Sequence, residues 1–294
     1  MTTTRKTALA DLARAVNPIK FAESLGIDPD PWQRELLLST RKRIILNCSR
    51  QSGKSTITAV LALHHALNYP GALVLVLSPS LRQSGELFRK VRDFYRDLGK
   101  PIGSETDTAF ALEVANRSRV VSLPGKEQTV RGFSGASLLI IDEAARVPDD
   151  LYFAVRPMVA VSQGRVILLS TPYGKKGFFY QAWHSARERW EKVMVTAYDC
   201  PRITPETLEA EKESLGAWWF QQEYLCSFEQ NQQAVFDYDS VQAVFSNRIE
   251  AWSLTGSPET EPSYEPDAKR GEDEPSNGFV PRIIVKEWSL NGDV

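Results

Sequence analysis

The chain has 294 residues, of which 42% are hydrophobic and 24% are charged, and its formal net charge is −2. This composition is ordinary for a globular protein with a sizeable core, and no segment reaches the roughly 18 apolar residues of a membrane span, so we expect a cytoplasmic protein with no membrane partner. Its cysteines (Cys48, Cys200, Cys226) and histidines show no paired or metal-ligand spacing, which excludes a disulfide framework and a structural zinc site.

Up to about residue 230, short apolar runs alternate with helical stretches. The runs are continuous rather than alternating, which is typical of strands buried on both faces of a parallel sheet. The predicted strands are 43–48, 72–78, 119–123, 137–142 and 165–170. Helices are predicted at 55–67, 84–98, 204–216 and 217–228. This β-α-β pattern predicts an α/β fold of the P-loop NTPase class (ASCE or RecA-like), with a mainly parallel sheet flanked by helices and an extended C-terminal tail.

The sequence changes character near residue 250. Residues 254–278 contain four prolines and many acids, so we expect one domain over 1–250, an acidic Pro-rich linker or tail over 251–278, and a short segment over 279–294. Within that last segment, 279–290 has the composition of a strand. Residues 247–294 hold ten acidic and five basic side chains, so the preceding residues carry a net charge of +3. Binding of DNA would therefore require basic residues that cluster locally.

The stretch "NCSRQSGKST" (47–56) contains the end of a phosphate-binding loop, but Cys48 stands where the usual pattern has its first glycine. A predicted strand precedes the loop and a predicted helix follows it, as phosphate binding at a helix N-terminus requires. Lys54 would contact the β- and γ-phosphates of a nucleotide, and Ser55 would bind Mg²⁺. The alternative is a surface turn with an exposed lysine. The predicted ATP-binding residues of this loop are Ser49, Arg50, Gln51, Ser52, Gly53, Lys54, Ser55 and Thr56.

An acidic pair follows the apolar run "SLLII". A buried strand that ends in Asp142 and Glu143 would place Asp142 beside the metal bound by Ser55, and Glu143 would orient and polarise the attacking water. The second acid favours hydrolysis over binding alone. An ordinary helix N-cap is the alternative for this pair.

The stretch "LLSTPYGKKGFF" (168–179) is a further strand end followed by a glycine-containing loop. Its tip, Ser170, Thr171 and Pro172, would lie near the nucleotide in a parallel sheet, so Thr171 can sense the γ-phosphate and couple its state to the rest of the protein. A simple strand-terminating turn is the alternative.

Two further stretches of the sequence offer candidate site residues. Gln33 can pair with an adenine edge while Trp32 packs nearby, although Trp32 can equally be a core residue. Arg131, beside a glycine in "TVRGFSGA" (129–136), can stabilise the charge of phosphoryl transfer in its own or a neighbouring subunit. Its alternative is a solvated loop arginine.

Taken together, these motifs resemble the ATPase domain of tailed-bacteriophage terminase large subunits, over roughly residues 25–245. The matching stretches are "PWQREL", "CSRQSGKST", "VRGFSGASLLIIDEAARVP", "STPYGKKGFFY" and "EYLCSFEQNQQAVFDYDSV". In this family the first loop glycine is often absent and an arginine lies inside the loop, as Arg50 does here.

The resemblance implies ATP and Mg²⁺ as cofactors, catalytic roles for Glu143, Lys54, Arg50 and Arg131, and Asp142 and Ser55 as metal ligands. It also implies translocation of double-stranded DNA by a homo-oligomeric ring that works with a portal protein and a small terminase subunit. Full-length relatives carry a nuclease domain with several metal-binding aspartates; no such acidic cluster is visible here, so we do not expect DNA cleavage.

Two other functions remain as alternatives. A helicase-like or remodelling ATPase would share the upstream glutamine and the Asp-Glu strand, although the absence of a second RecA-like domain within the 294 residues argues against it. A non-hydrolysing, nucleotide-dependent assembly factor would not need Glu143.

Overall fold

The computed structural model describes residues 2–123, 125, 130, 132–186 and 189–230. The chain divides into two units, Met1–Phe245 and Ser246–Val294, and the described residues all belong to the first. Arg131, the predicted linker and the predicted strand at 279–290 therefore lie outside the described residues. Within the described part, no helix is both long and apolar enough to cross a membrane.

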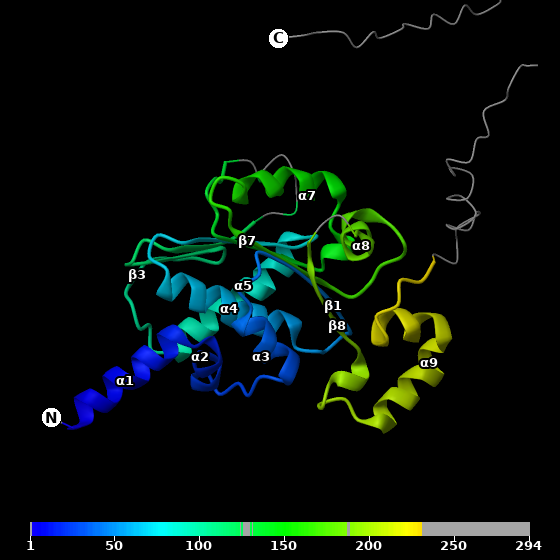
Figure 1. Ribbon diagram of the computed structural model, residues 1–294, viewed down its shortest axis with the longest axis horizontal. Helices are drawn as coiled ribbons and strands as arrows, with labels where there is room; N and C mark the ends of the chain where they lie inside the picture. Colours follow the sequence, from blue (N-terminus) through cyan, green and yellow to red (C-terminus); the bar gives the residue numbers. More distant parts are fainter. Residues whose placement is uncertain (1, 124, 126–129, 131, 187–188, 231–294) are drawn as a thin grey trace, which may run out of the picture. The chain divides into compact units, whose positions relative to one another are not determined.

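The described residues form one mixed sheet at the centre of the first unit (Figure 1). Its strands are β1 (Arg43–Cys48), β2 (Leu73–Leu77), β3 (Ser104–Asp107), β4 (Ala111–Val114), β5 (Arg119–Ser122), β6 (Leu138–Asp142), β7 (Arg165–Ser170) and β8 (Glu191–Val195). Their spatial order is β3-β4-β5-β2-β6-β7-β1-β8. In this spatial order, every neighbouring pair from β5 through β2, β6, β7 and β1 to β8 is parallel. Strand β4 runs antiparallel to both of its neighbours, β3 and β5. The predicted, mainly parallel α/β fold is thus confirmed.

The strands β1, β2, β6 and β7 are the four central apolar runs, and every residue of β2 and β6 is buried. The prediction that 119–123 is buried on both faces was wrong, because Arg119 is exposed and Val121 is only half-buried in β5. This strand pairs with the short antiparallel β4, so it lies toward the edge of the sheet, where one face is not fully covered.

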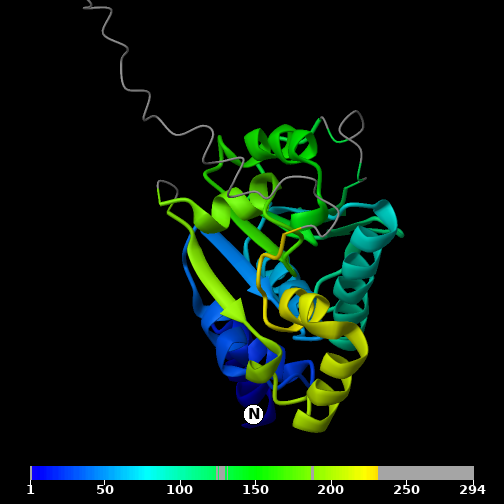
Figure 2. The ribbon, with the colours of Figure 1, turned by 90° about the vertical axis from the view of Figure 1, so that its right-hand side faces the viewer.

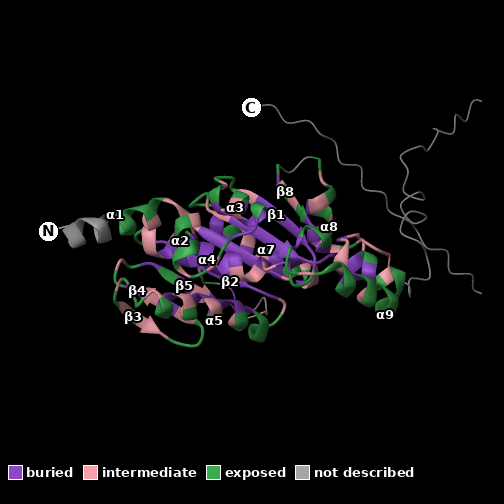
Figure 3. Cartoon of the chain, turned by 90° about the horizontal axis from the view of Figure 1, so that it is seen from below, coloured by how far each residue is buried: buried purple, intermediate pink, exposed green. Residues whose placement is uncertain are grey.

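Helices cover both faces of the sheet, and the buried residues concentrate in the strands between them (Figures 1 and 3). One core joins α2, α3, α4 and α5 to strand residues such as Ile44, Leu46 and Ile140. A second core joins α7 and α8 to the alternate residues, such as Ile45 and Ile141. The bounds are α1 (Thr2–Val16), α2 (Pro18–Ser24), α3 (Pro31–Leu38), α4 (Lys54–Asn68), α5 (Leu81–Asp97), α7 (Asp149–Val155), α8 (Gly177–His184) and α9 (Pro205–Tyr224), with single 3-10 turns η1 (Ala144–Arg146), η2 (Arg156–Val159) and η3 (Ala197–Asp199).

The helices predicted at 204–216 and 217–228 form the two parts of α9, which is interrupted at Gly216 by non-helical backbone (φ 75°, ψ 164°). The second part ends at Tyr224, four residues earlier than predicted. Cys226 has a left-handed backbone (φ 60°), and its carbonyl accepts a hydrogen bond from the Asn47 side-chain amide at 2.9 Å. This contact with β1 brings the chain after α9 back to the carboxyl end of the strands (Figure 2).

Candidate functional site

The predicted phosphate loop connects the end of β1 to the start of α4. Cys48 is still the last residue of β1 and is completely buried, so its backbone is extended and needs no glycine. Gly53 is the N-cap of α4 and has a left-handed backbone (φ 87°), which glycine adopts without steric cost. The loop therefore keeps the glycine that its geometry requires and replaces the one that it does not.

The amide groups of this loop are only partly free. The Arg50 N–H donates to the Glu223 carbonyl at 3.1 Å. The Ser49 N–H likewise donates to Val195 at 2.8 Å. Among the described residues, the amides of Gln51, Ser52 and Gly53 donate to no protein group. These amides lie at a helix N-terminus, where unpaired N–H groups and the helix dipole favour an anion.

Strand register brings the acidic tip of β6 next to this loop. Strand β7 lies between β1 and β6, and it pairs Ser170 with Asn47 on one side and Leu169 with Asp142 on the other. The Ser55 hydroxyl donates to Asp142 Oδ2 at 3.2 Å, so the two predicted metal ligands meet. Burial, followed by the neighbouring Glu143 carboxylate, raises the pKa of Asp142 from 3.8 to about 6.

Glu143 follows Asp142 in an unusual backbone conformation. Its φ of 52° and ψ of 40° are left-handed, a conformation that costs about 1 kcal/mol or more for a residue with a side chain. Two cations flank its carboxylate: Lys54 Nζ lies 3.7 Å from Oε1, and the Arg146 guanidinium donates to Oε2 at 3.1 Å. The Glu143 carboxylate thus lies between the phosphate-loop lysine and Arg146.

The predicted coupling residues end β7 next to this acid. Ser170, Thr171 and Pro172 are all buried, and Thr171 Oγ1 accepts a hydrogen bond from the Arg146 Nη1 at 3.1 Å. Thr171 is thereby joined to Glu143 through one guanidinium. Sequence reasoning missed Arg146, although its position three residues after Glu143 in "DEAAR" is the spacing that puts two side chains on one helical turn.

A second missed residue, Glu223 of α9, joins that helix to the loop. Its side chain is only 5% exposed, and its two carboxylate oxygens pair with Arg50 Nε at 2.6 Å and Arg146 Nη2 at 3.3 Å. The predicted catalytic Arg50 thus lies against α9 here. Nothing in the local pattern "QQEY" points to this role, because the three charges come together only in the folded chain.

Trp32 and Gln33, the predicted adenine-side residues, both lie in α3. Trp32 is 9% exposed and belongs to the apolar core, in line with the packing alternative. The Gln33 amide oxygen accepts the Asp30 N–H at 3.0 Å, and its nitrogen lies 3.4 Å from the Ser52 carbonyl. Arg202, which sequence reasoning also missed, pairs with both Asp30 oxygens (2.9 and 2.7 Å) and donates to the same Ser52 carbonyl at 3.1 Å.

The last residue of the predicted ATP-binding set, Thr56, lies in the first turn of α4. Its hydroxyl accepts a hydrogen bond from Lys90 Nζ of α5 at 3.0 Å. This bond joins the first turn of α4 to its neighbouring helix, on the same side of the sheet.

The oxygen donors at this edge fit a small hard cation. Asp142 supplies a buried carboxylate and Ser55 a hydroxyl within hydrogen-bonding distance of it, and Mg²⁺ takes oxygen ligands of this kind while keeping several waters. No group of three or more His, Cys, Asp or Glu side chains is placed to hold a metal ion anywhere among the described residues, this edge included. A metal ion held here would therefore take only Asp142 and Ser55 from these side chains, with water or nucleotide oxygens as its other ligands.

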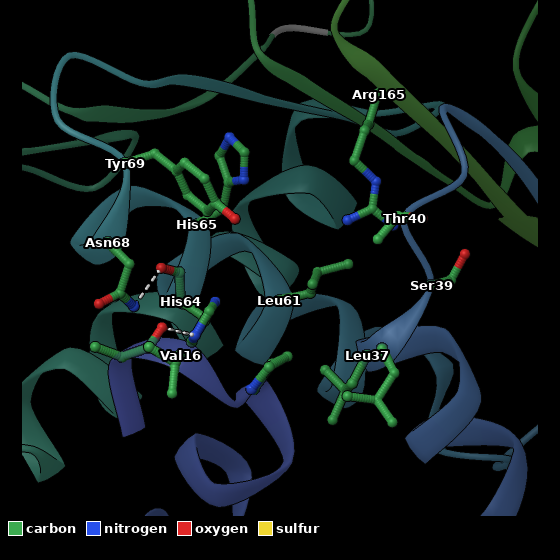
Figure 4. A pocket seen from close by; sticks show the side chains of 13 residues that line it. Val16, Leu37, Ser39, Thr40, Leu61, His64, His65, Asn68, Tyr69 and Arg165 are labelled. Atoms are coloured by element: carbon green, nitrogen blue, oxygen red, sulfur yellow. Dashed lines mark hydrogen bonds between the residues drawn. The ribbon is translucent and has the colours of Figure 1, made fainter. Parts of the chain in front are cut away.

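A cavity of about 650 Å³ lies at the opposite, amino-terminal edge of the sheet. Figure 4 shows Ser39, Thr40 and Arg165 along one side of it, and residues from the end of α4, such as His64 and Asn68, along the other. Arg165 begins β7, whereas Ser170 ends that strand beside the phosphate loop. This cavity is therefore separate from the candidate site.

A mainly parallel sheet that presents a Gly-Lys-Ser loop, an adjoining helix N-terminus and an acidic pair at one carboxyl edge defines a P-loop nucleotide-binding protein. Comparison with protein families gives the more particular assignment. A family profile described as "Terminase large subunit, T4likevirus-type, N-terminal" matches residues 45–243, and the chain belongs to this family.

Individual relatives agree with this assignment. The chain is 30% identical over 180 residues to the terminase large subunit of Thermus phage G20c, a match that covers 54% of this chain and 37% of the relative. It thus spans well under half of that protein.

Two solved structures share the fold. The large terminase ATPase domain of Thermus phage P74-26 superposes with a TM-score of 0.63 at 23% identity, covering 71% of this chain and 98% of that one. The large terminase of another thermophilic bacteriophage, in complex with ATP-gamma-S, gives a TM-score of 0.53 at 14% identity, covering 70% of this chain and 51% of that one.

Proposed function

We propose that this chain hydrolyses ATP with Mg²⁺ and uses the energy to move double-stranded DNA into a viral procapsid. The observation that carries the proposal is the meeting of Lys54, Ser55, Asp142 and Glu143 at one edge of the sheet. The ATP-gamma-S complex of the thermophilic phage terminase supports an adenine nucleotide as the ligand.

Each of these side chains has a distinct role in the proposed reaction. Lys54 and the free amides of Gln51 to Gly53 bind the phosphates. Asp142 and Ser55 hold Mg²⁺, which when bound neutralises charge on the phosphate oxygens. Glu143 orients the attacking water and accepts its proton. Ser170, Thr171 and Pro172 couple this site to the rest of the protein, while Trp32, Gln33, Ser49 and Thr56 hold the loop and the base side of the nucleotide.

The assembled motor extends beyond the chain itself. We propose a homo-oligomeric ring in the bacterial cytoplasm that acts with a portal protein and a small terminase subunit, and in which Arg131 reaches the active site of a neighbour. The ATPase domain occupies 1–250, followed by the acidic tail over 251–278 and the segment 279–294. The proposed activity does not include DNA cleavage.

The direct test is phosphate release from ATP by the purified chain, with Mg²⁺ and with excess EDTA. Lys54→Ala should weaken nucleotide binding about 10- to 100-fold, the effect of losing one or two charge-assisted hydrogen bonds. Lys20→Ala, which removes a surface lysine of α2 paired with Glu23, is the control and should bind normally. The proposal would be contradicted if excess EDTA did not reduce phosphate release, or if Lys54→Ala bound nucleotide as tightly as wild type.

A further inference from the structure

Arg146 makes more contacts at the candidate site than its position in a short turn suggests. Its Nη1 donates to Glu143 Oε2 and to Thr171 Oγ1, both at 3.1 Å, and its Nη2 pairs with Glu223 Oε1 at 3.3 Å. The guanidinium carbon also lies 4.7 Å from the centre of the Tyr173 ring. One side chain thus contacts four residues from three separate segments: the turn after β6, the segment that ends β7 and continues to Tyr173, and helix α9.

The local backbone explains how Arg146 reaches Glu143. The 3-10 turn η1 follows Glu143 directly, and the Arg146 N–H donates to the Glu143 carbonyl at 2.9 Å. This turn places the two side chains on the same side of the chain. Since a glutamate side chain has three rotatable bonds, a planar guanidinium that donates to one oxygen restricts where the carboxylate can lie.

The contact with α9 is costly to break. The Glu223 side chain is 5% exposed, and its partners are Arg146 on one oxygen and Arg50 on the other. Burial of a carboxylate without cationic partners is strongly unfavourable. Arg146 is therefore held toward Glu223 at the same time as it holds Glu143, and a displacement of α9 changes the position of the guanidinium.

We propose that Arg146 is a positioning residue for ATP hydrolysis: it orients the Glu143 carboxylate and, through its contact with Glu223, makes that orientation depend on the position of α9. This inference rests on the proposed function, because it assigns a role to a neighbour of the proposed catalytic acid. Arg146 acts through Glu143, so its loss should lower kcat and leave nucleotide affinity unchanged.

The test compares Arg146→Gln, Arg146→Lys and Glu223→Gln in the full chain, with kcat and KM for ATP and the Kd for a fluorescent ATP analogue. Arg92→Gln is the matched control, since its side chain is 20% exposed, against 24% for Arg146, and pairs with Asp107 away from the site. Arg146→Gln should lower kcat about 100-fold, the scale of a misplaced catalytic group, with Kd within about twofold of wild type. Arg146→Lys keeps the charge but not the planar guanidinium, so its kcat should lie between that of Arg146→Gln and that of wild type.

Four outcomes would decide the inference. The positioning role stands if Arg146→Gln and Arg92→Gln lower the melting temperature equally but only Arg146→Gln lowers kcat, and if a variant that carries both Arg146→Gln and Glu223→Gln has the same kcat as Arg146→Gln alone. Wild-type kcat in Arg146→Gln, or a kcat in Arg146→Lys no better than in Arg146→Gln, would overturn it. Absence of hydrolysis by the wild-type chain would instead overturn the proposed function, and this inference with it.

Discussion

The buried position of Asp142 disfavours the ionised form of its carboxyl group in the folded protein. Burial raises its pKa from 3.8 to about 6, so the folded chain holds the proton more tightly than the unfolded chain does. This tighter proton binding stabilises the folded state relative to the unfolded state. The stabilisation is fully present below the unfolded pKa of 3.8 and is lost as the pH rises through the folded pKa of about 6. Without metal, the ionised carboxylate therefore destabilises the protein at neutral pH. Mg²⁺ binding, which requires that ionised form, should weaken as the pH falls below about 6.

We expect Asp142→Asn to be more stable than wild type at pH 8 in the absence of metal. The rise in pKa corresponds to about 3 kcal/mol as an upper bound, and the gain should vanish at about pH 3 or below, where the carboxyl is largely protonated in both states. Urea unfolding at the two pH values, in EDTA, measures the difference. A gain of equal size at about pH 3 and at about pH 8 would show that ionisation of Asp142 is not its cause.

The loop between β1 and α4 depends on one glycine for two separate reasons. Gly53 has a φ of 87°, and a Cβ atom there would lie 2.8 Å from the Gln33 side-chain nitrogen and 3.4 Å from Arg202. Gln33 and Arg202 both reach the Ser52 carbonyl, so a methyl group would displace the groups that brace the loop.

Gly53→Ala should therefore lose both stability, by about 1–2 kcal/mol, and nucleotide affinity. Gly71→Ala is the matched control, because Gly71 has a φ of 73° with nothing within 4 Å of its added Cβ. It should show a similar loss of stability with normal affinity. Isothermal titration with an ATP analogue separates the two effects. Equal affinity in both variants would mean that the Gln33–Arg202 brace does not shape the loop.

The buried central strands were predictable from sequence, and the edge strands were not. The runs at 43–48, 137–142 and 165–170 match β1, β6 and β7 to within one residue, because strands covered on both faces have unbroken apolar sequences. The strands β3, β4 and β8 mix half-buried, exposed and buried positions, so no continuous run marks them. The break in α9 at Gly216 was visible, but its early end depends on the contact of Cys226 with Asn47.

The same distinction applies to the site. Ser55, Asp142 and Thr171 were predictable because each follows or ends a buried parallel strand, and such strand ends converge at one edge. Glu223 was not predictable, since it meets Arg146 across 77 positions of sequence and Arg50 across 173. The pairing of Asp30 with Arg202, across 172 positions, was hidden for the same reason. Motifs indicate which residues perform chemistry, whereas the residues that hold them are set by tertiary contacts.

At the scale of the whole molecule, the proposed action of Arg131 on a neighbouring subunit requires that subunits of the ring share active sites. Arg131→Ala and Glu143→Ala spoil different halves of such a shared site, so a mixture should contain some interfaces with both groups intact. We expect partial recovery of ATPase activity in assembled mixtures, because arginine fingers contribute about 10³–10⁵ in rate. Each variant alone, assembled at the same total concentration, is the control. Mixtures as inactive as either variant would mean that Arg131 acts within its own subunit or only supports its loop.

The central claim, that this edge of the sheet is an ATP-hydrolysing site, is tested most directly by separating binding from turnover in Glu143→Ala. The variant should bind ATP with Mg²⁺ as tightly as wild type and lose at least about 100-fold in kcat, because the residue that activates water is gone while the phosphate-binding groups remain. Glu113→Ala, on β4 away from the site, should retain full activity. Turnover by Glu143→Ala close to that of wild type would contradict the account.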